Sequence, residues 1–157
     1  MPQTSRGYPY PTLPDPPNTS LHLQQLAQAL NGDVGALAAL VEQLRTTTNV
    51  TTGAVAASGW TVASMDADVV AGRSVYLSLT FRGPALTPGS NGNIGDTTIA
   101  TLPATIRPRQ LAQFVYGDGQ AHGEGLINPD GTIVLRTLST SISSGTNTRL
   151  YVSYTLP

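Results

Sequence analysis

The stretch Arg73–Gly83 reads RSVYLSLTFRG, and its apolar and polar positions alternate from Ser74 to Phe81. A repeat of two residues is that of a β-strand, whose successive side chains point to opposite faces. An apolar face opposite a hydroxyl-rich face is typical of an antiparallel sheet with one side in water. The stretch therefore predicts a half-buried strand, with Val75, Leu77, Leu79 and Phe81 inside and Ser74, Tyr76, Ser78 and Thr80 outside.

Other parts of the chain also have the alternating residues of strands and the Pro- and Gly-containing sequences of turns. TRLYVSYTL, residues 148–156, alternates in the same way, and NPDGT, residues 128–132, has the proline and glycine of a tight turn. Residues 46–60 are rich in Thr, Gly and Ala, and we interpret them as a transition into the strands. Many short strands separated by turns predict a mainly β protein, with residues 47–157 forming an antiparallel β-sandwich or jelly-roll head. The expected strands are 59–63, 67–70, 73–82, 97–102, 111–116, 124–127, 132–138 and 149–156.

Residues 20–46 have a different period, because leucines recur there at helical spacing. The matching position in the middle of the array is Asp33, flanked by Gly32 and Gly35, which weaken a helix. The segment is either one continuous helix, which we favour, or two helices over 20–31 and 34–46 with Asp33 capping the second. The apolar positions are Leu23, Leu26, Leu30, Leu37, Leu40 and Leu44.

The apolar face of this segment either packs on its own domain or associates with other copies. Ala27, Val34 and Val41 widen the face, and the segment has few charges. These features favour self-association, and apolar positions beside the seam favour three strands over two. We expect a short coiled-coil stem that trimerises the chain.

RGYPYPTLPDPPNTS, residues 6–20, precedes the helix, and six of the twelve prolines of the chain lie within residues 1–17. Proline fixes its own φ and favours extended backbone before it. Residues 1–19 are therefore expected to form an extended arm that reaches up to ~50 Å and lies in a groove of a large partner, rather than an untethered tail. The contacting residues are expected to be Arg6, Tyr8, Pro9, Tyr10, Pro11, Leu13, Pro14, Pro16 and Pro17.

Composition excludes several classes of function. The 157 residues have a net charge of −1, which argues against binding to nucleic acid. No lysine or cysteine is present, which removes phosphate-loop, Schiff-base and thiol chemistry. No apolar run is long enough for a signal peptide or a membrane span, so we expect a soluble protein that is not exported by a standard signal.

The polar clusters do not predict an active site. Asp118, His122 and Glu124 lie in GDGQAHGEG, and the last two share a strand face. The only other histidine is His22 in the helical segment, and no known metal-binding spacing is present. Asp66 and Asp68 share a strand face without another acid-base group in the neighbouring sequence. We therefore expect no enzyme activity, no metal and no cofactor.

Two further residues admit two interpretations. Arg107 and Arg109 bracket Pro108 in LPATIRPRQ. They either contact a small anion or glycan, or they pair with acidic residues across the sheet or between subunits. We favour the second interpretation.

The order of these parts resembles short trimeric fibre and decoration proteins of tailed phages of actinobacteria. The resemblance rests on RGYPYP followed by a D-P-P turn and a Leu/Ala-rich helix (6–34), on IATLPATIRPRQ (99–110) and on INPDGTIVLR (127–136). It implies a homotrimer with its arms on the major capsid protein or another virion protein and its heads facing outward. The short chain, which has no repetitive shaft, favours a capsid decoration or head-fibre protein on the virion surface over a tail fibre.

A receptor-binding or carbohydrate-binding protein is the alternative, with a host cell-surface glycan as its ligand. Aromatic side chains of the head are the candidates for stacking on sugars, although strand alternation places several of them in the core or at subunit contacts. They are Trp60, Tyr76, Tyr116, Tyr151 and Tyr154.

Overall fold

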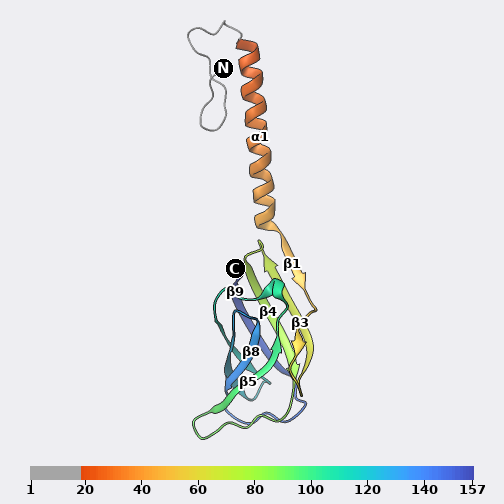
Figure 1. Cartoon of the computed structure of the whole chain (residues 1–157), viewed down its shortest axis with the longest axis vertical. Coiled ribbons are helices and arrows are strands. Elements are labelled where there is room, and N and C mark those ends of the chain that lie inside the picture. The colour runs from red at the N-terminus through yellow and green to blue at the C-terminus, as the bar shows by residue number, and fades with distance from the viewer. Residues whose placement is uncertain (1–18) are drawn as a thin grey trace. The chain divides into compact units, whose positions relative to one another are not determined.

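The computed structural model describes residues 19–157 in two parts, a helix ending at Arg45 and a compact β unit from Thr46 to Pro157. The helix, α1, runs without a break over Thr19–Arg45 (Figure 1). The interpretation as two helices is wrong: good helix formers on both sides carry α1 through Gly32 and Gly35, at a cost of ~1 kcal/mol for each glycine relative to alanine. Arg45 places a positive charge at the carboxyl end of the helix, where the helix dipole favours it.

Nine strands make up the β unit. All of the paired strands are antiparallel, and they form one sheet in the order β1-β3-β4-β9-β6-β7-β8-β5-β2. The strands are β1 (Thr47–Val50), β2 (Val55–Ala56), β3 (Thr61–Val70), β4 (Ser74–Arg82), β5 (Asn93–Thr101), β6 (Ala112–Gly117), β7 (His122–Ile127), β8 (Thr132–Thr137) and β9 (Thr148–Thr155), with the 3-10 helix η1 (Ala104–Ile106) before β6.

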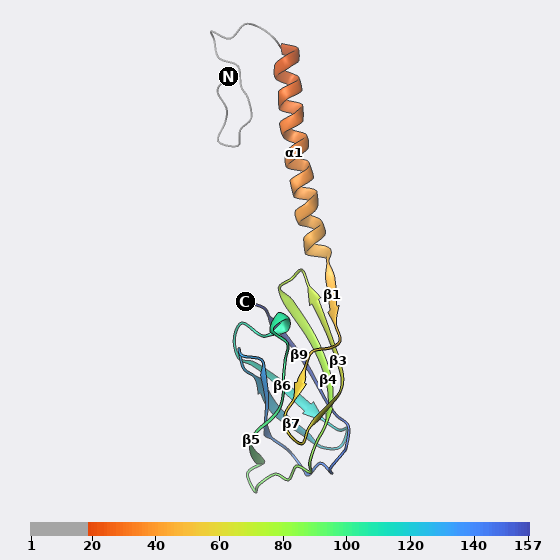
Figure 2. The ribbon, with the colours of Figure 1, turned by 45° about the vertical axis from the view of Figure 1, so that its right-hand side comes forward.

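The sheet curls around a common interior, as Figures 1 and 2 show. The expected mainly antiparallel β fold is confirmed, whereas the sandwich or jelly-roll form is not, because the strands pair into a single sheet. Irregular registers between Val62 and Ser64 on β3, and along β5, are the kind of bulge that bends and twists a strand.

Two details of the strand prediction are wrong. The separate strands expected at 59–63 and 67–70 are one long strand, β3, because β4 pairs with it over its whole length. The transition at 46–60 contains two short strands, β1 and β2, which are the two edges of the sheet. Their Thr- and Ala-rich sequences have too little apolar alternation to be recognised.

The core lies on the concave side of the sheet. The strand at 73–82 behaves as its alternation predicts, with Val75, Leu77, Leu79 and Phe81 buried in β4. Phe81 packs between Trp60 and Tyr116, with ring centroids 5.8 Å and 6.3 Å away, and Phe114 meets Tyr116 edge-on at 6.2 Å. Offset and edge-on aromatic pairs of this kind add to the burial energy.

The turn between β3 and β4 has an unusual residue. Ala71 and Gly72 have φ values of 56° and 62°, and the amide of Arg73 donates to the carbonyl of Val70. Two consecutive positive φ values are those of a tight hairpin turn, which favours Asn or Gly at the first position. Ala71 therefore has a left-handed backbone conformation, which is unfavourable because its Cβ comes close to the following carbonyl oxygen.

The arm lies outside the described residues. Its expected contact residues are Arg6, Tyr8, Pro9, Tyr10, Pro11, Leu13, Pro14, Pro16 and Pro17, and their role remains a prediction.

Candidate functional site

The first candidate surface is the row of leucines along α1. Their exposed fractions run from 36% at Leu26 to 65% at Leu23, and Val34 and Val41 beside them are exposed as well. Spacing by three and four residues places these side chains on one side of the helix. We call this row the leucine seam; it consists of Leu23, Leu26, Leu30, Leu37, Leu40 and Leu44. An apolar stripe that stays in water is a surface for association.

The second candidate surface is the outer face of the sheet. Tyr76, Val115 and Tyr151 point outward from β4, β6 and β9, and their exposed fractions are 58%, 61% and 66%. Tyr151 lies opposite Val115 on one side and Ser78 on the other. The three large side chains therefore form one cluster on three adjacent strands.

A groove of about 750 Å³ opens on this face. A smaller one of about 390 Å³ lies on the β4 side of the same cluster, between Tyr76 and Tyr151. The cluster thus has a hollow on both sides. The larger groove is lined by Gln113, Val115, Glu124, Arg136, Tyr151 and Ser153, among others.

Charged side chains surround the cluster. On β3, Asp66 and Asp68 both point outward, as their spacing predicts, and each carboxylate accepts a hydrogen bond from the side-chain Nδ2 of Asn49 on β1, at 2.5 Å and 2.9 Å. At the end of the face, Arg82 donates to Asn147, and Arg149 is exposed on β9. Asn49 went unrecognised because β1 was not expected.

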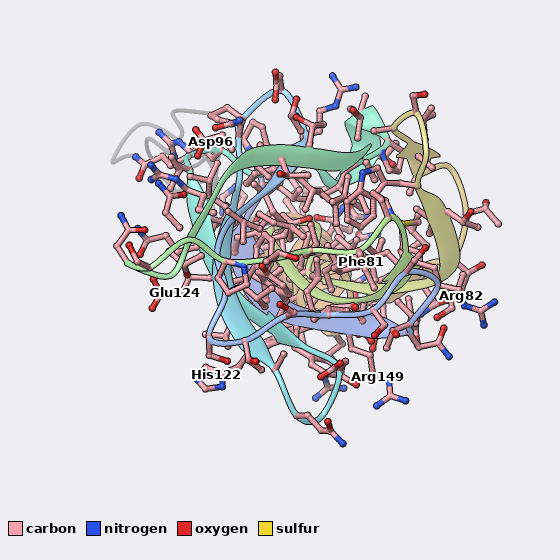
Figure 3. The ribbon with its side chains drawn as sticks, turned by 90° about the horizontal axis from the view of Figure 1, so that it is seen from below. Phe81, Arg82, Asp96, His122, Glu124 and Arg149 are labelled. Atoms are coloured by element: carbon pink, nitrogen blue, oxygen red, sulfur yellow. The ribbon has the colours of Figure 1, made fainter. Side chains whose placement is uncertain are left out.

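His122 and Glu124 share the outer face of β7, as their spacing predicts. Figure 3 shows both side chains pointing away from the strands, whereas Phe81 lies inside them. The imidazole Nδ1 of His122 lies 3.3 Å from the hydroxyl of Ser139. No group of three or more metal-ligating residues occurs within residues 19–157.

Two glycines of GDGQAHGEG, Gly123 and Gly125, are explained by the packing of the core. Gly123 and Gly125 lie on the inner face of β7, directly over the rings of Tyr116 and Phe114 on β6. A Cβ on Gly123 would lie 2.7 Å from the Tyr116 ring, and one on Gly125 would lie 2.5 Å from the carbonyl oxygen of Val134. The absence of side chains on this strand makes room for the aromatic core.

Asp118 builds the turn before β7. Its carboxylate accepts hydrogen bonds from the amides of Gln120 and Ala121, at 2.9 Å and 2.8 Å. These two hydrogen bonds lower the pKa of Asp118, and the bond from Gln120 has the larger effect. The carboxylate therefore shapes the loop and is held in its charged form, which suits neither an acid nor a base near neutral pH.

Arg107 has a structural role within the chain. Its Nε donates to the carbonyl of Leu102 at 3.2 Å, and the side chain packs against Gly131, which has a φ of 89°. The amide of Thr132, and to a smaller extent the charge of Arg107, lowers the pKa of Asp130 in the same turn. The LPATIRP and NPDGT motifs thus form one packed corner. Arg109 is exposed.

The candidate sugar-stacking residues divide into two groups. Tyr116 is buried and donates from its hydroxyl to the carbonyl of Thr137 at 2.7 Å, while Tyr154 is partly buried and donates to that of Ile106. Burial raises the pKa of Tyr116 to about 12 and that of Tyr154 still further. Trp60 packs on Phe81, so only Tyr76 and Tyr151 offer an exposed ring.

The described part of the chain is thus a mainly β protein, a curled antiparallel sheet of nine strands preceded by one α-helix. Within it, no helix has both the length and the apolar character needed to cross a membrane. No protein-family model matches the sequence, and neither does any curated protein.

Among solved structures, the chain is similar to the head domain of the lactococcal phage bIL170, discussed as a common fold for the receptor-binding domains of lactococcal phages. The two are 20% identical with a TM-score of 0.45, over 70% of this chain and 100% of that one. A likeness at this level does not carry a function from one protein to the other, and the function of this chain rests on its own residues.

Proposed function

We propose that this chain is a structural protein of a phage virion, a homotrimer held together by α1. The proline-rich segment before α1 attaches the trimer to the major capsid protein or to another virion protein, and the β unit faces outward. A capsid decoration or head-fibre protein is favoured over a tail fibre, because a single residue, Thr46, separates α1 from β1 and leaves no room for a shaft between the helix and the β unit.

The observation that carries this proposal is the leucine seam. Fully burying a leucine contributes ~1.5–3 kcal/mol, and the seam leucines are exposed by roughly half. Each of them therefore has ~1 kcal/mol still to gain from association. With six such residues in each of three chains, the seam offers enough energy to offset the loss of translational and rotational freedom.

The side of α1 opposite the seam is more polar than the seam. Its outer positions include Gln24, Gln28 and Glu42, while Asp33 is the one charged residue within the leucine repeat. Gly32 and Gly35 also fall on the outer side of the heptad repeat, where an added Cβ would meet nothing within 4 Å. The weak helix formers thus do not disturb the seam.

The first experiment tests the trimer. The mass of the full chain, measured by light scattering, is compared with that of the double variant Leu30→Glu, Leu37→Glu. We expect three chains for the former and one for the latter, because two added carboxylates on either side of Asp33 would place several like charges in the seam. The matched control is Gln28→Glu with Ala38→Glu, on the outer side of the helix, which keeps three chains. A monomeric full chain at micromolar concentration would contradict the proposal.

The second experiment tests attachment. Deletion of residues 1–18 leaves α1 and the β unit intact, so the truncated chain is expected to stay trimeric and to lose binding to purified particles. Tyr8→Ala with Tyr10→Ala is a milder variant, expected to weaken binding without changing the mass. Normal decoration of particles by the truncated chain would show that the arm has no part in attachment.

A second candidate function is recognition of a host cell-surface glycan. It is supported by the exposed rings of Tyr76 and Tyr151 beside grooves that contain Gln113, Glu124 and Arg136. Aromatic faces with polar neighbours suit sugar rings. A glycan array probed with the full chain and with Tyr151→Ala separates this candidate from a purely structural protein.

A further inference from the structure

The outer face of the sheet has an uncharged centre that extends beyond its three large apolar side chains. We call it the outer-face patch; it consists of Tyr76, Ser78, Val115, Tyr151 and Ser153. Cross-strand pairing makes it continuous, because Tyr151 faces Ser78 and Val115, and Ser153 faces Tyr76. Isolated exposed apolar residues are ordinary on a protein surface, but a cluster on three adjacent central strands marks an interaction site.

The patch has the composition of a protein–protein interface. The centre of such interfaces is poor in charge and rich in aromatic residues, and the charged residues form the rim. Here the charges begin with Asp66 and Asp68 on one flank, with Glu124 on the other flank, and with Arg82 and Arg149 at one end. Tyr151 lies between two grooves, and side chains of a second folded protein can fit into them.

Within residues 19–157, no salt bridge pairs any of these rim charges. Asp66 and Asp68 bond to neutral Asn49, Arg82 bonds to neutral Asn147, and the one salt bridge of the described residues joins Arg136 to Asp96. Asp66 lies on β3 and Arg149 on β9, with β4 between them. Strand spacing separates these two side chains by ~10 Å or more, which is too far for an ion pair.

We propose that a second copy of this chain covers the outer-face patch, and that the acidic flank of one β unit meets the arginine end of the next. This inference rests on the proposed trimer. In a ring of three, each contact joins two different surfaces of the same chain, so separate acidic and basic flanks on one face are complementary. A single residue joins α1 to β1, so trimerisation of α1 holds the three β units at a high effective concentration.

The proposal predicts which tyrosines lose solvent access in the trimer. Hydroxyl-radical footprinting is performed on the full chain and on the monomeric Leu30→Glu, Leu37→Glu variant. Tyr76 and Tyr151 are expected to react several-fold more slowly in the trimer. Val55, exposed on edge strand β2 away from the patch, is the internal control and reacts equally in both.

Charge reversal tests the pairing of the flanks. Asp66→Arg with Asp68→Arg places like charges together, so labelling of Tyr151 is expected to rise toward the monomer value while the mass stays that of three chains. Adding Arg82→Asp and Arg149→Asp to the same chain restores opposite charges and lowers the labelling again. Only a contact between the two flanks is rescued in this way.

The outcomes separate the two proposals. A monomeric full chain removes the proposed trimer itself. A trimer in which Tyr76 and Tyr151 react as fast as in the monomeric variant overturns the outer-face contact and leaves the trimer standing. Protection of Tyr151 in the trimer only after a saccharide is added also overturns it, and assigns the patch to a glycan instead.

Discussion

Replacing Gly125 by alanine tests the packing that β7 imposes on the core. The added Cβ would lie 2.5 Å from the carbonyl oxygen of Val134 and 2.7 Å from Cε2 of Phe114, both far inside a normal contact. The carbonyl belongs to the neighbouring strand β8 and cannot rotate away. Phe114 is 4% exposed and packs on Tyr116, so its ring has nowhere to move.

The magnitude follows from these contacts. Inserting a methylene into a well-packed core costs ~1–3 kcal/mol, and a contact with backbone favours the upper end of that range. We therefore expect Gly125→Ala to lower the free energy of unfolding by ~2–3 kcal/mol. The double variant with Phe114→Leu is expected to destabilise less than the sum of the two single variants, by at least ~0.5 kcal/mol, because the smaller side chain relieves part of the clash.

The assay is urea unfolding followed by fluorescence of Trp60, the single tryptophan, which packs on Phe81 in the core. Protein concentration is held constant, because association changes the apparent stability. Gly35→Ala is the matched control: its Cβ meets nothing within 4 Å, so the same chemical change leaves the β unit unaffected and strengthens α1. A Gly125→Ala midpoint shift worth less than ~0.5 kcal/mol would refute the reasoning.

Three further predictions concern the β unit. Because burial raises the pKa of Tyr116 to about 12, the folded protein keeps a phenol proton that the unfolded chain loses near pH 10, so stability falls between these values; Tyr116→Phe makes the fall smaller in alkaline unfolding titrations. Ala71→Asn relieves the left-handed turn and is expected to stabilise by ~0.5–1 kcal/mol in the urea assay; destabilisation would contradict this conformation. Arg136→Ala removes an exposed salt bridge with Asp96. We expect it to lower the free energy of unfolding by only ~0–1 kcal/mol, so the thermal midpoint falls slightly, and by less in high salt.

The candidate surfaces were predictable to different degrees. Leucine spacing alone identified the seam, because helix periodicity is visible in a single segment. The outer-face patch was not predictable as a unit. Alternation assigned Tyr76 and Val75 to opposite faces, but no local pattern shows that β9 lies beside β4 and brings Tyr151 next to Val115 on β6.

The sequence by itself determined the mainly β class, the inward face of β4, the tight turn at 128–132 and the helical repeat before Arg45. These depend on backbone periods and turn residues that act within a few positions. The tertiary structure decided that β3 is one strand, that Gly123 and Gly125 make room for Tyr116 and Phe114, and that Arg107 holds a turn. Each of these results depends on a partner distant in sequence, and the energy of packing is gained only when that partner is in place.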